Sequence, residues 1–182
     1  TRAERYIAQK KYDEAVLEYR AALKQDPNRG DARLRLADLH AQQGDVQAAF
    51  TEYIRAADAM PNSTEAQLKA GALLLMANRF AEAKSRAESV LRRTPRNAAA
   101  LMLLGNALAG LDDVPGAFDL LRQAIDVDPA SGPAYSNMGA LQLAHGDRRL
   151  AEASFKKAIA ADPKSATARV ALASYYRWQN GE

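Results

Sequence analysis

Residues 30–63 read GDARLRLADLHAQQGDVQAAFTEYIRAADAMPNS, and residues 64–97 repeat the same pattern of small, bulky and turn-forming positions. Gly44 and Asn78 stand at the same place near the middle of the two stretches, and Pro61 and Pro95 stand at the same place near their ends. A proline recurs at one constant interval along the whole chain, at Pro27, Pro61, Pro95, Pro129 and Pro163. A period of roughly 34 residues indicates a stacked array of small supersecondary units.

The period divides the 182 residues into four complete and two partial units. The complete units cover residues 30–63, 64–97, 98–131 and 132–165, and the partial units cover 1–29 and 166–182. One unit cannot bury its apolar face alone, so we expect all of them to stack as a single solenoid domain over residues 1–182. The chain begins without Met and has no targeting leader, and we therefore expect it to be part of a longer protein.

Capping and turn residues predict two helices in each unit. Each unit ends on a short polar residue that can accept hydrogen bonds from the free amides of the next helix, namely Ser63, Asn97, Ser131 and Ser165. Residues that tolerate the left-handed conformation stand midway, namely Gly44, Asn78, Asp112, Gly146 and Asn180. We expect the second helix of unit 98–131 to begin at Pro115 and the late proline of each unit to end its second helix.

Columns of small residues mark the places where helix backbones must approach closely. Alanine fills one second-helix column, at Ala15, Ala49, Ala83, Ala117 and Ala151. Alanine or glycine fills a first-helix column, at Ala3, Ala37, Gly71, Gly105, Gly139 and Ala173. Bulky residues that we expect in the core include Leu36, Leu104, Met138 and Leu172 from first helices, with Tyr53, Leu121 and Phe155 from second helices.

These columns resemble the tetratricopeptide repeat family. The small, small, aromatic, alanine and proline pattern of the family is present as Gly139, Ala151, Phe155, Ala158 and Pro163, and again as Ala37, Ala49, Tyr53, Ala56 and Pro61. The family's early aromatic position departs from the pattern, reading Arg33, Gln67, Leu101, Tyr135 and Arg169. The resemblance implies an all-α, right-handed superhelical solenoid of antiparallel helix hairpins, with first helices that line a concave groove.

The resemblance also implies which side chains would meet a ligand in that groove. They are Leu34, Asp38, Leu68, Ala72, Leu75, Met76, Met102, Asn106, Ser136, Ala140, Leu143, Val170, Ser174 and Trp178. Most of these residues are small or apolar, and we expect a protein or peptide partner that is apolar or amphipathic. The family's clamp for a terminal carboxylate is absent, because Met102, Thr167 and Ala171 fill its cationic places, and the family's asparagine ladder is absent too.

Catalytic, metal and cofactor chemistry finds no support in the sequence. There is no Cys, and His40 and His145 each lack the helical partner four residues away that a metal site needs. We expect His40 to be a packing residue with a polar tip and His145 to be solvated. No phosphate-binding loop or nucleophile elbow occurs, and we expect no enzyme activity and no cofactor.

The charge pattern argues against nucleic acid as a partner, and the lengths of the apolar runs argue against a membrane span. The formal net charge of the chain is +3, but the sign of the charge alternates over the first five units, whereas nucleic-acid binding favours a continuous basic stripe. The longest apolar runs, at residues 70–77 and 98–105, are far shorter than the ~20 residues of a membrane-spanning helix.

We therefore expect a non-catalytic protein-interaction scaffold. A second resemblance, to repeat lipoproteins of bacterial outer-membrane and exopolysaccharide-export systems, is carried by residues 5–7, 12–15 and 30–34. It favours the bacterial periplasm or outer membrane over the cytoplasm. The alternative is a regulatory or substrate-recruiting region of a larger enzyme. The last helix carries Tyr175, Tyr176 and Trp178 and has no following hairpin to cover all of them. We therefore expect it to cover the previous hairpin and to leave an apolar patch, which either self-associates or packs on further sequence.

Overall fold

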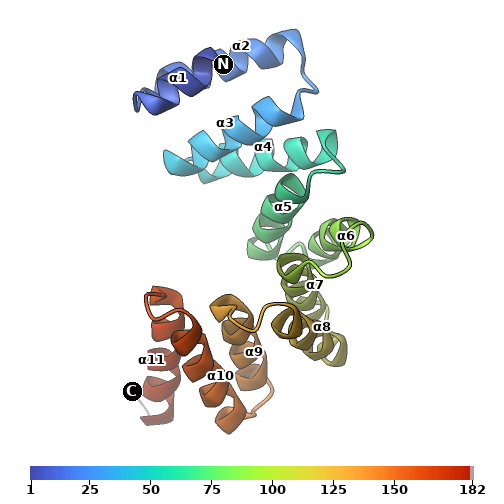
Figure 1. Cartoon of the computed structure of the whole chain (residues 1–182), viewed down its shortest axis with the longest axis vertical. Coiled ribbons are helices and arrows are strands. Elements are labelled where there is room, and N and C mark those ends of the chain that lie inside the picture. Colours follow the sequence, from blue (N-terminus) through green and yellow to red (C-terminus); the bar gives the residue numbers. More distant parts are fainter. Residues whose placement is uncertain (181–182) are drawn as a thin grey trace. The chain divides into compact units, whose positions relative to one another are not determined.

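The computed structural model describes residues 1–180, and within them every regular element is an α-helix. The chain forms two compact units, Thr1–Ala77 and Asn78–Glu182. The first contains α1 (Arg2–Ala8), α2 (Tyr12–Gln25), α3 (Gly30–Gln42), α4 (Val46–Ala59) and α5 (Thr64–Met76). The second contains α6 (Phe80–Leu91), α7 (Ala98–Gly110), α8 (Val114–Val127), α9 (Gly132–Ala144), α10 (Arg148–Ala161) and α11 (Ala166–Asn180). The predicted all-α fold is confirmed (Figure 1).

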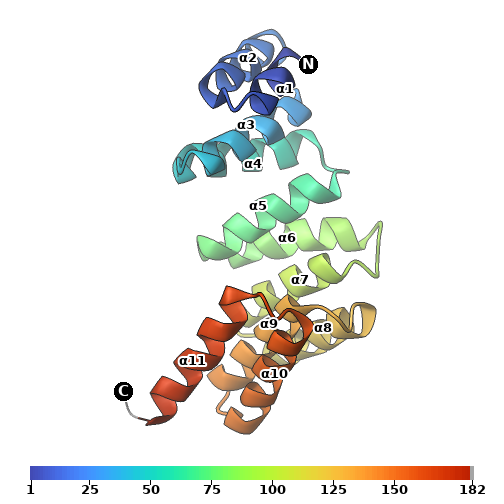
Figure 2. The ribbon, with the colours of Figure 1, turned by 60° about the vertical axis from the view of Figure 1, so that its left-hand side comes forward.

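Within each unit, helices that follow one another in the sequence pack side by side. In the first unit, α3 lies along α4, and it also contacts α2, as Figure 2 shows. In the second unit, α9 packs on α10, and α11 contacts both of these helices. First helices also touch one another there, since α9 contacts α7 as well as α11. Each unit is thus a stack of helix hairpins.

The predicted caps are present. The side chains of Ser63, Asn97, Ser131 and Ser165 each accept a hydrogen bond from the backbone amide three residues later. The predicted start of α8 at Pro115 is one residue late, because Asp113 caps the helix by accepting a hydrogen bond from the Gly116 amide. Val114 is therefore the first helical residue, and Pro115 lies in the first turn.

The inter-helix turns use the left-handed conformation at the same place in successive repeats. The φ angles are 80° at Gly44, 56° at Asn78, 62° at Asp112 and 83° at Gly146. The structure adds Lys10, with a φ of 58°, to this series. No turn is predicted at Lys10 from its residue type, because lysine seldom adopts this conformation.

The alanine and glycine columns are buried where bulky residues from the next helix meet them, and only Ala173 on the last helix is exposed. A Cβ atom built on Gly105 would lie 3.2 Å from Leu121 Cγ, and one built on Gly139 would lie 2.8 Å from Phe155 Cδ1. Ala37 shares a core cluster with Tyr53. In these repeats, each small residue of the first helix therefore leaves the space that a bulky residue of the next helix fills.

Polar side chains replace the family's early aromatic in several units and bind the backbone instead. Arg33 donates to the carbonyl oxygen of Pro27, and Arg169 donates to that of Pro163, which is the equivalent proline. Gln67, which is 3% exposed, donates to the carbonyl oxygen of Ala57 at 2.6 Å. These bonds tie the start of a first helix to the end of the preceding second helix, so the departure from the family pattern does not disturb the fold.

The last helix packs on the hairpin that precedes it, as the sequence predicts. Tyr175 is 3% exposed and shares a cluster with Ala151 and Phe155, and the Tyr176 hydroxyl donates to Glu152 at 2.8 Å. These two aromatic side chains therefore pack on α10. The side chain of Trp178 lies outside the described residues.

Candidate functional site

The candidate site is the face of the first helices that the sequence indicates as the ligand surface. In the unit Thr1–Ala77 this face belongs to α3 and α5. Leu34 on α3 is only 5% exposed and packs in the core with Tyr53 and Ala37. Its side chain therefore supports the fold and is not available to a ligand.

An apolar strip on α5 is accessible to solvent. Met76 is 78% exposed, Ala72 is exposed, and Leu68 and Leu75 are half-buried. Residues four, seven and eight positions after the first share one side of a helix. The four side chains therefore form a continuous apolar strip, and we call Leu68, Ala72, Leu75 and Met76 the α5 strip.

A polar cluster joins α3, α4 and α5 in the same unit. Asp38 Oδ1 accepts hydrogen bonds from the Tyr53 hydroxyl at 2.6 Å and from Lys69 Nζ at 2.5 Å. Lys69 also pairs with Glu65 at 3.1 Å, and its ammonium lies 5.5 Å from the centre of the Tyr53 ring. The cluster positions Asp38 by holding its carboxylate between three helices.

Electrostatics keep this cluster in one protonation state at neutral pH. Burial, followed by the hydrogen bond to Asp38, raises the pKa of Tyr53. Burial on its own would lower the pKa of Lys69, but its hydrogen bonds to Asp38 and Glu65 outweigh burial, and the pKa is raised. The tyrosine is therefore neutral and the lysine charged, and the cluster holds a fixed pattern of donors and acceptors.

The first-helix face in the unit Asn78–Glu182 combines small, polar and apolar side chains. Asn106 on α7 and Ser136 on α9 are half-buried, and Ala140 and Ser174 are exposed. Val170 on α11 is 62% exposed. Met102 and Leu143 are half-buried and also pack on the core, Met102 against Leu121 and Leu143 against Phe155. On this face, isolated apolar side chains are separated by small ones.

Sequence reasoning found Asp38 but missed its partners. Tyr53 is predicted only as a core residue, and no role is predicted for Lys69. The sequence does contain a signal for the pair. Ala72 is the position equivalent to Asp38 in the next repeat, and Lys69 lies one helical turn before it. A comparison of equivalent positions misses this pair, because its two residues are not at equivalent positions.

The described helices offer neither a metal cluster nor a membrane span. Among residues 1–180, no group of three or more His, Cys, Asp or Glu residues is arranged to hold a metal ion. No described helix is both long enough and apolar enough to cross a membrane.

The sequence profile of the tetratricopeptide repeat matches residues 1–64, 68–133 and 137–182. The chain belongs to the tetratricopeptide repeat family. No curated protein matches the sequence. Tetratricopeptide arrays are generally interaction scaffolds without catalysis of their own, and the chain has the fold of such a scaffold.

Solved structures of tetratricopeptide proteins resemble the chain over most of its length. MamA from Desulfovibrio magneticus RS-1 is 22% identical with a TM-score of 0.73, covering 90% of this chain and 93% of MamA. TTC0263 from Thermus thermophilus is 23% identical with a TM-score of 0.72, covering 96% and 95%. YrrB, described as having an unusual peptide-binding site, is 18% identical with a TM-score of 0.73, covering 93% and 87%. Identities this low establish the fold alone.

Proposed function

We propose that the first-helix face binds an apolar or amphipathic segment of a partner protein. The α5 strip carries this proposal, because it places Met76 at 78% exposure on the same side of the helix as Leu68 and Leu75. Exposed apolar side chains that stand together, rather than singly, are typical of interaction surfaces. Asp38 and Lys69 lie beside the strip and offer polar contacts that set the orientation of a bound segment.

The size of the surface limits the affinity. Burying a large apolar side chain contributes about 1.5–3 kcal/mol, and association costs at least ~4 kcal/mol. Three or four such side chains therefore support binding no tighter than about micromolar. Because most of the contacts are apolar, the binding depends only weakly on salt.

Substitution of the two exposed members of the strip tests the proposal. Ala72→Glu with Met76→Glu places two charges in the strip without touching the core, so the melting temperature stays nearly unchanged. Leu17→Glu is the matched control, because Leu17 is also an exposed apolar residue, at 65%, but lies on α2. We expect the double variant to lose proteins that the wild type captures from its native cell extract, and the control to keep them. Equal capture by all three proteins would contradict the proposal.

The proposed scaffold is one continuous array over residues 1–182. The repeat period runs unbroken through the boundary at Ala77 and Asn78, which supports this arrangement. A single calorimetric transition is expected, and two separate transitions would contradict it.

A role in a bacterial envelope assembly is the finer proposal. It rests on the weak resemblance of residues 5–7, 12–15 and 30–34 to repeat lipoproteins. The full reading frame tests it: a lipoprotein signal upstream supports it, whereas an adjoining catalytic domain would favour a substrate-recruiting region of an enzyme.

A further inference from the structure

A hollow of about 670 Å³ opens between α2, α3 and α4 of the first unit. Its floor is apolar and includes Leu23 and Leu36, together with His40, which is 6% exposed. Arg20 from α2 and Arg55 from α4 belong to the lining of the same hollow. The volume is within the range of ligand sites in proteins, roughly 300–1,000 Å³.

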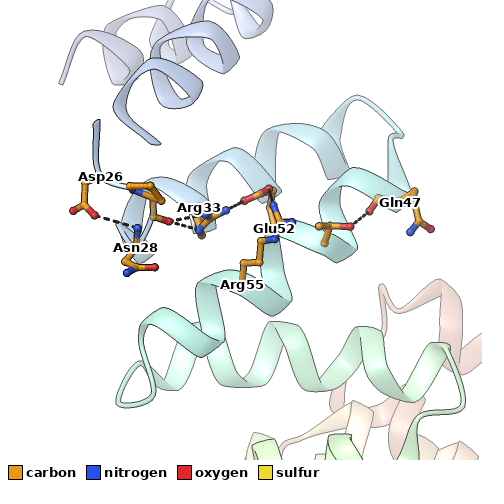
Figure 3. A network of polar contacts seen from close by, with 8 residues as sticks. Asp26, Asn28, Arg33, Gln47, Glu52 and Arg55 are labelled. Atoms are coloured by element: carbon orange, nitrogen blue, oxygen red, sulfur yellow. Dashed lines mark hydrogen bonds and ion pairs between the residues drawn. The ribbon is translucent and has the colours of Figure 1, made fainter. Parts of the chain in front are cut away.

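A network of polar contacts fixes one wall of this hollow (Figure 3). Arg33 Nε donates to the Pro27 carbonyl oxygen at 2.9 Å, and Arg33 Nη1 pairs with Glu52 Oε2 at 2.7 Å. Glu52 also pairs with Arg55 at 3.3 Å, although Arg55 keeps 58% of its side chain exposed. One carboxylate is thus shared by two arginines. Among the described residues, no carboxylate pairs with Arg20, so the hollow has an excess of positive charge.

The second unit contains a matching hollow of about 370 Å³ between α8, α9 and α10. Arg122 in its lining holds the same place in its repeat as Arg20, three repeats further along the chain. Eight further pairs of lining residues are also three repeats apart, with the residue of the first hollow given first: Leu23 and Ile125, Arg33 and Tyr135, Leu36 and Met138, His40 and Gln142, Asp45 and Asp147, Ala48 and Leu150, Glu52 and Ser154, and Arg55 and Lys157. The two units therefore carry the same site at equivalent positions.

The two hollows carry the same kinds of residue at the rim and on the floor. Their rim ion pairs differ, because Arg122 pairs with Asp119 at 3.2 Å, whereas Arg20 has no such partner among the described residues. Each has an arginine on the preceding second helix and a cation on the following one, and each has an apolar floor. The walls differ. The ion pair of the first wall is replaced in the second by a hydrogen bond from Ser154 to Gln142 at 2.7 Å, and Lys157 lies 5.6 Å from the centre of the Tyr135 ring.

The pair of cations is not a general feature of the repeat. One repeat after the first hollow, the positions of its two rim arginines hold Ile54 and Ser89. Two repeats after it, they hold Glu88 and Gln123. Two cations return only three repeats after the first hollow, as Arg122 and Lys157. The helix pattern alone therefore does not explain why they recur.

We propose that the two hollows are a matched pair of docking sites for acidic peptide segments. In each site the two rim cations bind carboxylates of the peptide, and the floor takes a neighbouring apolar side chain. Asp45 and Asp147 also line the hollows and repel a nucleic-acid backbone, which carries a negative phosphate at every nucleotide. A peptide can instead place its carboxylates only at the rim cations. The occupant is therefore an acidic, partly apolar peptide and not a nucleic acid.

These sites are separate from the first-helix face proposed above for the apolar partner. On α3, the hollow uses Arg33, Leu36 and His40, whereas the first-helix face uses Asp38. Positions three and seven residues apart share one side of a helix, and Asp38 lies on another. Substitutions at the rim cations therefore leave the α5 strip and the polar cluster intact.

The test titrates the full chain with a fluorescein-labelled peptide of repeated Leu-Glu-Glu-Phe and reads fluorescence anisotropy and calorimetric stoichiometry. We expect two peptides per chain for the wild type, one for Arg20→Gln with Arg55→Gln, and one for Arg122→Gln with Lys157→Gln. The variant with all four substitutions should bind at least about tenfold more weakly. The matched control is Arg96→Gln with Lys164→Gln, two exposed cations outside both hollows, and it keeps two peptides.

Each remaining outcome contradicts the proposal. Undiminished binding by the fourfold variant, whose fold circular dichroism verifies, would place the peptide elsewhere, and so would equal loss in the control. Equal binding of a Leu-Gln-Gln-Phe peptide would show that carboxylates do not matter. Tighter binding of a single-stranded oligonucleotide that the same variants lose would assign the sites to nucleic acid. Capture through the α5 strip is read separately, so failure here leaves that proposal intact.

Discussion

Phe155 lies against the backbone of Gly139 so closely that a Cβ atom on the glycine would stand 2.8 Å from two carbons of the ring. The ring is 2% exposed and cannot turn away without losing its other contacts. The aromatic ring on the following helix therefore requires a glycine at position 139. The small residue of one repeat column and the bulky residue of another thus depend on each other.

Gly139→Ala is therefore expected to destabilise the protein by about 1–2 kcal/mol, even though alanine favours the helix by up to ~1 kcal/mol. Urea unfolding measures the change. Phe155→Leu in the same chain should recover part of the loss by making room for the new methyl group. An increase in stability from Gly139→Ala alone would show that the contact is looser than described.

The cluster of Asp38, Tyr53 and Lys69 predicts a loss of stability at alkaline pH. Both Tyr53 and Lys69 have a folded-state pKa above their usual values of 10.0 and 10.5. A raised pKa contributes stability that is fully present below the unfolded value and is lost as the pH rises above it. Thermal melting from pH 8 to about 11 should therefore show a decline that is smaller in Tyr53→Phe with Lys69→Met. An equal decline in both proteins would contradict this account.

Lys10 is a lysine in a left-handed turn, with a φ of 58° at a position where other repeats have Gly, Asn or Asp. The conformation costs a non-glycine residue roughly 1–2 kcal/mol. Lys10→Asn should relieve part of this strain and raise the melting temperature, whereas Lys10→Val should lower it. A melting temperature that falls with both substitutions would show that the lysine side chain itself is needed.

Asn97 caps α7 by accepting a hydrogen bond from the Ala100 amide at 2.9 Å. Asn97→Ala should cost about 1 kcal/mol in urea unfolding, and Asn97→Ser should cost little. Lys11 is the matched control, because it precedes α2 without a side-chain cap. Lys11→Ala with the same cost as Asn97→Ala would argue against capping as the cause.

The sequence predicts helices and turns well because capping and left-handed turns depend on single residue types. Ser63 and Asn97 have the predicted caps, and Asn78 and Asp112 have the predicted turns. The left-handed turn at Lys10 could not be predicted from its residue type, because lysine seldom adopts this conformation.

The candidate site is less predictable, because exposure on a helix depends on neighbours. Leu34 and Leu68 hold the same place in their repeats, yet Leu34 is 5% exposed and Leu68 is half-buried. The apolar stripe of a packed helix is wide, and the sequence does not tell its edge from its centre. Asp38 also pairs with Lys69, which lies one helical turn before the position equivalent to Asp38 in the next repeat. A comparison of equivalent positions cannot reveal such a pair.

A photo-cross-linking amino acid in place of Met76 tests the central claim most directly, with the same amino acid in place of Leu17 as the comparison. Both side chains are exposed, at 78% and 65%, but only Met76 belongs to the α5 strip. If the first-helix face binds the partner, irradiation in the native cell yields a cross-linked protein from position 76 and none from position 17. A product from position 17 alone, or the same product from both positions, would contradict the account.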